Sequence, residues 1–429
     1  MISLPIPLNL MLSKETRRNL SELLVSRYKY VLFLDSNEYD DAYGTYNWLL
    51  MAGNEEVPGI SDEGTDSFNL LKDFLNSNNI PVIPGFFSYD LKNQIERLDS
   101  SNPDQTGFPL AGFFKPSTII GEKRSGTRFL YGATDGLIDE ATLFGRVEKK
   151  FPSIKLSAEL NREEYRETFE KIRNHLLRGD IYEMNYCLHF SAIVKEINPL
   201  ELFARLNKNN PAPFSCFLKY NNNYLICSSP ERFLARNGEQ VVSQPIKGTT
   251  RLTGDPEQDI RAREALKCDL KELSENIMIT DIVRNDLSFY ALPGSVKVTE
   301  LCAVYPFPTV FQMITTIEAR CATNVPSADI IRKAFPMGSM TGAPKIRAME
   351  IAEELETFKR GIYSGAVGYF KPDGSFDFNV VIRSFTWNSE NGYLSLSTGS
   401  AVTEKATADQ EYDECQLKAE ALIRSLEPS

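Results

Sequence analysis

The sequence predicts an α+β fold in which large, mostly antiparallel sheets are flanked by helices. Strand-like and helical stretches come in blocks along the chain rather than in strict alternation, which is typical of α+β proteins. With 429 residues, 42% of them apolar, the chain buries a large core and ordinarily forms two or three domains. A basic, irregular passage at residues 149–153 marks the expected end of an N-terminal region over residues 1–150.

Short apolar runs bounded by turn residues predict the strands. The apolar opening of the chain lacks the features of a leader and predicts an edge strand. Residues 99–107 are a loop by composition. The clearest strand segments are 30–34, 224–227, 233–235, 365–369 and 380–385, and the whole stretch 181–248 is strand-like.

Helical spacing of apolar residues predicts helices at 161–178, at 269–287, after 341–344 and at 409–426. The first helix is expected to bury the following side chains and to stop at Gly179: Tyr165, Phe169, Ile172 and Leu176. The second is expected to face inward with Leu270, Leu273 and Ile277. In the third, Thr341 or Gly342 is the expected cap and Pro344 suits the first turn.

Composition excludes several classes of function. A net charge of −11 argues against nucleic acid as a partner, and no apolar run approaches the roughly 18 residues of a membrane span. The seven cysteines form no Cys-x-x-Cys pair, so neither a zinc site nor a disulfide framework is indicated, and a reducing, cytoplasmic setting is expected. With two histidines and no Gly-x-Cys-x-Gly or Gly-x-Ser-x-Gly elbow, the chain carries no hydrolase triad of its own.

Two carboxylate pairs share one spacing, Glu272 with Glu275 and Glu411 with Glu414. Residues three apart lie on one face of a helix. If the two helices meet, a hard cation must neutralise the cluster, and Mg²⁺ suits carboxylates that leave room for water and substrate oxygens. The alternative is two ordinary solvated helix faces.

Lys247, in the run Pro-Ile-Lys-Gly-Thr, is a candidate nucleophile. A desolvated site with cationic neighbours would lower its pKa towards the reactive amine, whereas a strand-end lysine is ordinarily a solvated surface residue. Glu231 lies at the tip of a tight turn, where a glutamate is ordinarily exposed; beside Lys247 it would serve as a general acid.

Further candidate groups for binding an acidic ligand lie towards the C-terminus. The glycine-rich block 335–345 opens a helix, whose free N–H groups suit a carboxylate or phosphate, or are simply a capped helix start. Arg383, at the end of a predicted strand, suits a planar carboxylate or a surface ion pair, and Tyr363 could join it. The run 396–402 is expected to end a strand in a loop of small residues at 399–401, which permits close backbone approach to a ligand.

These motifs occur together, in this order, in the chorismate-utilising enzymes related to anthranilate synthase component I, and residues 158–426 resemble that family. The resemblance implies sheets with chorismate bound between them, a required Mg²⁺, and a chorismate-binding catalytic region over residues 158–426. The matching motifs are Ser-Pro-Glu-Arg-Phe (229–233), Pro-Ile-Lys-Gly-Thr (245–249), Lys-Glu-Leu-Ser-Glu (271–275), Asp-Ile-Val-Arg-Asn-Asp-Leu (281–287), Met-Gly-Ser-Met-Thr-Gly-Ala-Pro-Lys (337–345) and Gly-Ile-Tyr-Ser-Gly-Ala-Val-Gly-Tyr (361–369).

The resemblance also implies roles for single residues. Glu275 and Glu414 become the metal ligands, with Glu272 and Glu411 beside them. Lys247 becomes the nucleophile that attacks C2 of the ring, and Glu231 the acid that protonates the departing C4 hydroxyl. The implied chorismate-binding residues are Gly248, Thr249, Tyr363, Arg383, Gly399, Ser400 and Ala401.

Lys247 occupies the position that divides the family. Anthranilate and salicylate synthases usually have alanine there, whereas the branch that forms aminodeoxychorismate, for 4-aminobenzoate and folate, has lysine. The resemblance therefore implies amination of chorismate with ammonia from a separate glutamine amidotransferase small subunit. The alternatives are an anthranilate synthase component I and a catalytically idle regulatory subunit that binds tryptophan or chorismate.

Three positions depart from the family pattern: Gln312 replaces a frequent histidine, Ala401 a glycine, and Glu183 a glutamine. Gln312 cannot shuttle a proton, which disfavours pyruvate elimination to anthranilate, and Glu183 speaks against the lysine-assisted hydroxylation of isochorismate-forming relatives. Some relatives bind tryptophan in the N-terminal region, for which a purely structural pocket is the alternative. The comparable positions here are Ser36, Tyr43, Gly44, Thr45, Tyr46, Pro213, Phe214 and Ser215.

Overall fold

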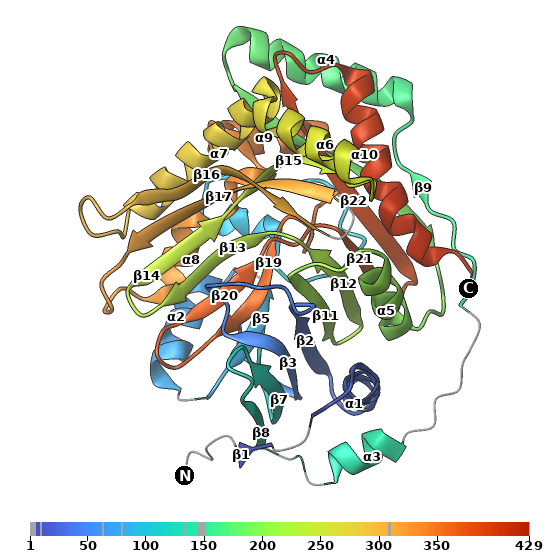
Figure 1. The fold of residues 1–429 in the computed structure, drawn as a ribbon, viewed down its shortest axis with the longest axis vertical. Helices are drawn as coiled ribbons and strands as arrows, with labels where there is room; N and C mark the ends of the chain where they lie inside the picture. The colour runs from blue at the N-terminus through green and yellow to red at the C-terminus, as the bar shows by residue number, and fades with distance from the viewer. Residues whose placement is uncertain are drawn as a thin grey trace.

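Two large antiparallel sheets form the centre of the protein, as the sequence predicts (Figure 1). The structure is a computed structural model, and it describes residues 6–428 with the exception of 9–10, 62–63, 79, 133, 135, 144–150 and 308–309. Every strand pair among these residues is antiparallel, which confirms the α+β class.

The larger sheet has 12 strands and begins at an edge with the first strand of the chain, as predicted from the apolar opening. Residues 1–5 of that opening lie outside the described residues. In spatial order its strands are β1 (Ile6–Pro7), β8 (Arg128–Gly132), β7 (Thr118–Lys123), β3 (Tyr46–Gly53), β2 (Tyr30–Asp35), β11 (Phe214–Tyr220), β12 (Asn223–Ser229), β21 (Ser384–Asn388), β22 (Tyr393–Thr403), β10 (Glu183–Ile193) and β18 (Gly342–Ala343), and β9 (Ser157–Ala158) also pairs with β10.

The smaller sheet has 10 strands and ends at the strand that carries Lys247. In spatial order its strands are β15 (Ile246–Arg251), β17 (Val310–Arg320), β14 (Gln240–Gln244), β13 (Arg232–Asn237), β20 (Phe376–Asn379), β19 (Ala366–Phe370), β5 (Ile83–Phe87), β6 (Ala111–Lys115) and β4 (Glu55–Glu56), and β16 (Lys297–Pro306) also pairs with β17.

Helices cover the outer faces of both sheets, and α10 lies along β22 (Figure 1). The helices are α1 (Lys14–Arg27), α2 (Ser67–Ser77), α3 (Leu137–Leu143), α4 (Arg162–Arg178), α5 (Pro199–Asn209), α6 (Pro256–Cys268), α7 (Leu270–Ser288), α8 (Ser327–Ala334), α9 (Lys345–Leu355) and α10 (Ala408–Ile423), with short 3-10 turns η1 (Tyr89–Gln94), η2 (Gly338–Met340) and η3 (Arg424–Leu426).

Side-chain alternation along the strands divides the core into layers. In β2, Val31 and Phe33 pack towards α1, α4 and α5, whereas Tyr30 and Leu32 pack towards β5, β6 and β19 of the other sheet. The far face of the smaller sheet packs against α2, α7 and α8. The order of layers is therefore helices, larger sheet, smaller sheet, helices.

The N-terminal and C-terminal parts of the chain share both sheets. Strand β2 pairs with β11, and β5 pairs with β19, so each sheet joins strands from before and after residue 150. Residues 149–150 of the predicted boundary lie outside the described residues.

Helix α4 confirms its prediction closely. Asn161 and Glu164 form a capping box, and Gly179 ends the helix in the left-handed conformation. The side chains it buries are the four that the spacing predicts, Tyr165, Phe169, Ile172 and Leu176.

The predicted inward face of α7 is wrong. Leu270 is 79% exposed and Ile277 is 45% exposed, and Leu273 is only partly buried. The helix turns instead a mixed polar and apolar face to β15 and β17, with the following buried residues: Glu275, Asn276, Ile279, Thr280, Val283 and Leu287. Buried carboxylate and amide groups, which apolar spacing ignores, therefore share the inner face of this helix with Ile279, Val283 and Leu287.

Three local predictions also need correction. Residues 380–383 are not part of a strand, and β21 starts only after Arg383. Pro344 is the N-cap of α9, and Thr341 instead hydrogen-bonds to carbonyl groups of the preceding turn. Residues 399–401 lie inside β22 rather than in a loop at its end.

Candidate functional site

Lys247 and Glu183 join the two sheets at the candidate site. Lys247 lies on β15 at the edge of the smaller sheet, and Glu183 opens β10 in the larger one. The lysine Nζ donates a hydrogen bond of 2.9 Å to Glu183 Oε1, and the two side chains are 11% and 1% exposed. Lys247 is therefore a largely buried member of an ion pair and not a solvated surface lysine.

The charges around Lys247 differ from those expected. Burial alone would lower the pKa of Lys247, but the carboxylates of Glu183 and Glu275 outweigh burial and raise its pKa above the usual range. The expectation of cationic neighbours that lower this pKa is wrong. The resting side chain is an ammonium, and it becomes a nucleophile only after another group takes its proton.

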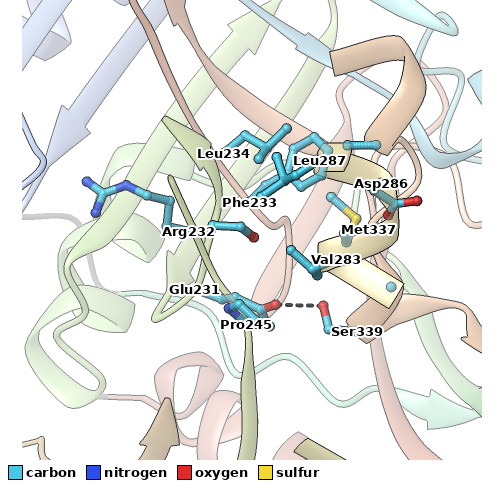
Figure 2. Close-up of a pocket in the computed structure, with 13 residues that line it drawn as sticks. Glu231, Arg232, Phe233, Leu234, Pro245, Val283, Asp286, Leu287, Met337 and Ser339 are labelled. Atoms are coloured by element: carbon cyan, nitrogen blue, oxygen red, sulfur yellow. Dashed lines mark hydrogen bonds between the residues drawn. The ribbon is translucent and has the colours of Figure 1, made fainter. Parts of the chain in front are cut away.

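Glu231 is buried in the turn between β12 and β13, although a glutamate at such a position is ordinarily exposed. Ser339 Oγ donates to Glu231 Oε1 over 2.6 Å, and Figure 2 shows this contact at one end of a cavity with apolar walls. Burial raises the pKa of Glu231 to about 7. A carboxyl group with this pKa carries a proton that it can donate near neutral pH.

One carboxylate of each pair, Glu275 of α7 and Glu411 of α10, shares a lysine partner across the two helices, and the convergence of all four stays a prediction. Lys271 Nζ lies 2.9 Å from Glu411 Oε1 and 3.8 Å from Glu275 Oε1, so one ammonium bridges the two helices. Glu414 pairs with Lys418 on its own helix. Burial raises the pKa of Glu275 to about 8, which shows how poorly this carboxylate is neutralised.

The carboxylates fit a hard cation. Glu275 Oε1 and Glu411 Oε2 are buried without a hydrogen-bond partner among the described residues. No group of three or more His, Cys, Asp or Glu side chains in that part of the chain is arranged to hold a metal. Mg²⁺ is commonly bound by one or two carboxylates with water and substrate oxygens, so the orphaned oxygens match its preference.

Backbone conformation brings β15 close to α7. Gly248 has a φ of +90°, and a Cβ built on it would lie 3.2 Å from Glu272 Oε2. Only glycine adopts this φ without strain, so it permits the close approach. Thr249 pairs with Gln312 across β15 and β17, and Gln312 Oε1 is buried without a partner among the described residues.

Arg383 and Tyr363 provide a cation and a hydroxyl near the same site. Arg383 has a φ of 53°, a conformation that non-glycine residues rarely adopt and that is frequent at functional sites. Within the described part of the chain its guanidinium makes no hydrogen bond or ion pair. Burial lowers its pKa, and Tyr363 and Glu414 are the charged or titratable groups that oppose this effect. The guanidinium is thus available to a carboxylate ligand.

The small residues of β22 face the partner strand β10. Ala401 pairs with Asn185 and Gly399 with Cys187. A Cβ built at Gly399 would lie 2.7 Å from the Asn185 amide, so this position has no room for a larger residue. Ser400 lies on the other face of the strand, where its hydroxyl is 3.2 Å from Tyr165 Oη.

A second cavity lies in the N-terminal region, at the positions compared with tryptophan sites. Ser36 Oγ is buried there without a partner among the described residues. Tyr43 and Thr45 do not line the cavity, and a role in tryptophan binding stays a prediction. The cavity is lined by six of the eight predicted residues, Ser36, Gly44, Tyr46, Pro213, Phe214 and Ser215.

Sequence reasoning missed four residues that support the site. Lys271 and Lys418 stand four residues from Glu275 and Glu414, so helical spacing would have identified them. Helical spacing could not have identified Ser339 or Asn276, because their contacts are with residues distant in sequence. Ser339 contacts Glu231, and Asn276 Nδ2 lies 3.5 Å from the Lys247 carbonyl oxygen.

No described helix has both the length and the apolar character needed to cross a membrane.

Comparison with known proteins gives one consistent picture. The family model described as chorismate binding enzyme matches residues 32–424. Aminodeoxychorismate synthase component 1 of Klebsiella aerogenes is 35% identical over 350 residues, which are 80% of this chain and 76% of that protein. Anthranilate synthase component 1 of Thermus thermophilus is 32% identical over 359 residues, covering 80% and 77%.

The fold is likewise that of a solved relative. The crystal structure of anthranilate synthase component I from Streptococcus pneumoniae superposes with a TM-score of 0.74 at 22% identity, covering 93% of each chain.

Proposed function

This chain belongs to the family of chorismate binding enzymes, and from that premise we propose that it converts chorismate and ammonia to 4-amino-4-deoxychorismate. The observation that carries the proposal is Lys247, a largely buried amine held between the two sheets. Near it lies Glu231, a carboxyl group whose pKa is raised to about 7. An alanine at this position would offer no nucleophile. The product leads to 4-aminobenzoate and folate.

In this proposal chorismate is held by its two carboxylates. Arg383, with an uncommitted guanidinium, and Tyr363 hold the side-chain carboxylate. The ring lies against the backbone of Gly248 and Thr249 in β15 on one side and of Gly399 to Ala401 in β22 on the other. Gln312 presents its unpartnered oxygen beside Thr249.

Lys247 then attacks C2 of the ring, the double bond shifts, and the C4 hydroxyl leaves as water with the proton of Glu231. Ammonia adds at C4 and displaces the lysine from C2, and the Glu231 carboxylate takes the proton that the new amine gives up. Two moderate steps thereby replace one difficult displacement.

Glu275 and Glu414, with Glu272 and Glu411 beside them, would hold Mg²⁺. When bound, the ion neutralises the carboxylate cluster and polarises the ring carboxylate of chorismate.

The ammonia would come from a separate glutamine amidotransferase subunit. The sequence has no nucleophile elbow for hydrolysing glutamine, and among the described residues no cysteine forms a hydrogen bond with a histidine.

Product analysis tests the proposal. Purified protein is incubated with chorismate, Mg²⁺ and ammonium, and the products are identified by mass spectrometry. We expect a species that keeps the enolpyruvyl group and that an added lyase converts to 4-aminobenzoate. Fluorescent anthranilate with released pyruvate would overturn the proposal and establish the anthranilate synthase alternative; no turnover of chorismate at all would indicate the regulatory alternative.

A further inference from the structure

We infer that Glu183 is the general base that takes the proton of Lys247 before attack and returns it when the lysine is released. The inference rests on the proposed function, because it concerns the nucleophile of that reaction. It deepens the proposal by adding a residue that touches a reacting atom.

The geometry suits direct proton transfer. Lys247 Nζ and Glu183 Oε1 are 2.9 Å apart, within the range for transfer along a hydrogen bond. Glu183 Oε2 is buried and has no partner among the described residues, so one whole side of the carboxylate remains available. The carboxylate is thus placed to accept a proton without breaking another contact.

The backbone holds Glu183 in place from both sides. The residue pairs with Ala343 of β18 and with Thr403 of β22, so it lies between two strands of the larger sheet. A base on such a backbone keeps its distance from the nucleophile, which proton transfer in a closed site requires.

The charges around Lys247 create the need for a base. Glu183 faces it from β10, Glu275 from α7 and Glu414 from α10, and all three favour the ammonium form. Glu231, from the turn after β12, is the fourth carboxyl group near it. Among these groups, Glu183 is the one that forms a hydrogen bond with the lysine in the described structure.

Neutralisation of the pair is also favoured by burial. A buried ion pair loses the hydration of both charges, and transfer of one proton converts it into a neutral amine and a neutral acid. Release of the proton into water is hindered because Glu183 is almost fully enclosed.

The complete cycle balances. The Lys247 ammonium gives a proton to Glu183, and the neutral amine bonds to C2 while C4–OH leaves as water with the proton of Glu231. Ammonia bonds to C4, the Lys247–C2 bond breaks, and Lys247 leaves as a neutral amine. The product ammonium returns a proton to Glu231, and Glu183 returns its proton to Lys247.

Glu183→Gln tests the inference, because glutamine still accepts the lysine hydrogen bond but cannot take a proton. The quantity measured is the rate of covalent adduct formation with chorismate and Mg²⁺ in the absence of ammonia, by rapid quench and intact-protein mass spectrometry. At pH 7 we expect about a 100-fold slower rate, a typical loss for a general base. Above pH 7 the ratio of the wild-type rate to the Glu183→Gln rate should fall by about tenfold per pH unit. The reason is that, below the pKa of Lys247, its neutral fraction rises about tenfold for each pH unit.

A purely structural role for Glu183 predicts that Glu183→Gln does not slow adduct formation. If Glu183 only orients Lys247, its replacement by glutamine removes a carboxylate that favours the ammonium, and adduct formation is as fast as in wild type or faster. That result, at unchanged chorismate affinity, would overturn the inference. A wild-type protein that makes 4-amino-4-deoxychorismate without any adduct would overturn the covalent route and this inference, but not the proposed function. A wild-type protein that makes no 4-amino-4-deoxychorismate would overturn the proposed function itself.

Two controls complete the experiment. Glu353→Gln alters another lysine–glutamate pair, buried Lys92 with partly buried Glu353 at 3.0 Å, and should leave the adduct rate unchanged. Glu183→Asp keeps a carboxylate at a greater distance and should react at an intermediate rate, with chorismate affinity within about twofold of wild type. An aspartate variant as slow as the glutamine variant, although folded by circular dichroism and equal in chorismate affinity, would contradict the base role.

Discussion

Lys247, the proposed nucleophile, lies among carboxylates that raise its pKa and favour its ammonium form. Its motif identified Lys247, and the turn sequence identified Glu231, but the sequence could not show their environments. The pKa of each depends on burial and on groups such as Glu183 and Ser339, which are distant along the chain. At the scale of single residues, the sequence predicted which side chains to consider for the site, but not the neighbouring groups that set their pKa values.

Glu231 should control the pH dependence of the first chemical step. Its pKa, raised by burial to about 7, means that the proton needed by the leaving hydroxyl is present below pH 7 and lost above it. The rate of adduct formation without ammonia should therefore fall as the pH rises past about 7. Glu231→Gln should lower the rate by about 100-fold at pH 6 and remove this fall.

Ser339→Ala is a second variant that tests whether Glu231 sets the pH dependence. The Ser339 hydrogen bond favours the ionised form of Glu231, so its loss should move the fall in rate to higher pH. A fall that persists unchanged in Glu231→Gln would show that another group supplies the proton.

Helices α4 and α7 show what helical spacing can and cannot predict. The buried face of α4 is entirely apolar, so its four core residues and both ends followed from the pattern. The buried face of α7 carries Glu275 and Asn276 towards the site, and two of its apolar residues, Leu270 and Ile277, point outward. A helix that serves a polar site breaks the rule that apolar residues mark the inner face.

The core contribution of α4 is open to a direct test. Phe169→Ala removes a fully buried ring from the layer between α4 and the larger sheet and should lower the free energy of unfolding by about 3–5 kcal/mol. Lys171→Ala, exposed on the same helix, should change it by no more than about 0.5 kcal/mol. The measurement is the shift of the urea unfolding midpoint; equal shifts for the two variants would contradict this packing.

On the scale of the whole molecule, the site exists because two sheets meet. Lys247 comes from the edge of one sheet, Glu183 and Gly399 from the other, and the carboxylates from helices on either side. The fold class followed from the order of elements, but the strand order did not, because β2 pairs with β11 across almost two hundred residues of chain. Long-range pairing of this kind leaves no local pattern in the sequence.

The central claim is that this assembly makes Lys247 a covalent catalyst. The most direct measurement is the intact mass of the protein quenched after mixing with chorismate and Mg²⁺ but no ammonia, followed by peptide mapping. The account predicts an added mass equal to chorismate less one water, on the peptide that contains Lys247, absent in Lys247→Ala and discharged by ammonium. Wild-type protein that yields aminodeoxychorismate without this adduct, or a Lys247→Ala variant that turns over at the wild-type rate, would contradict it.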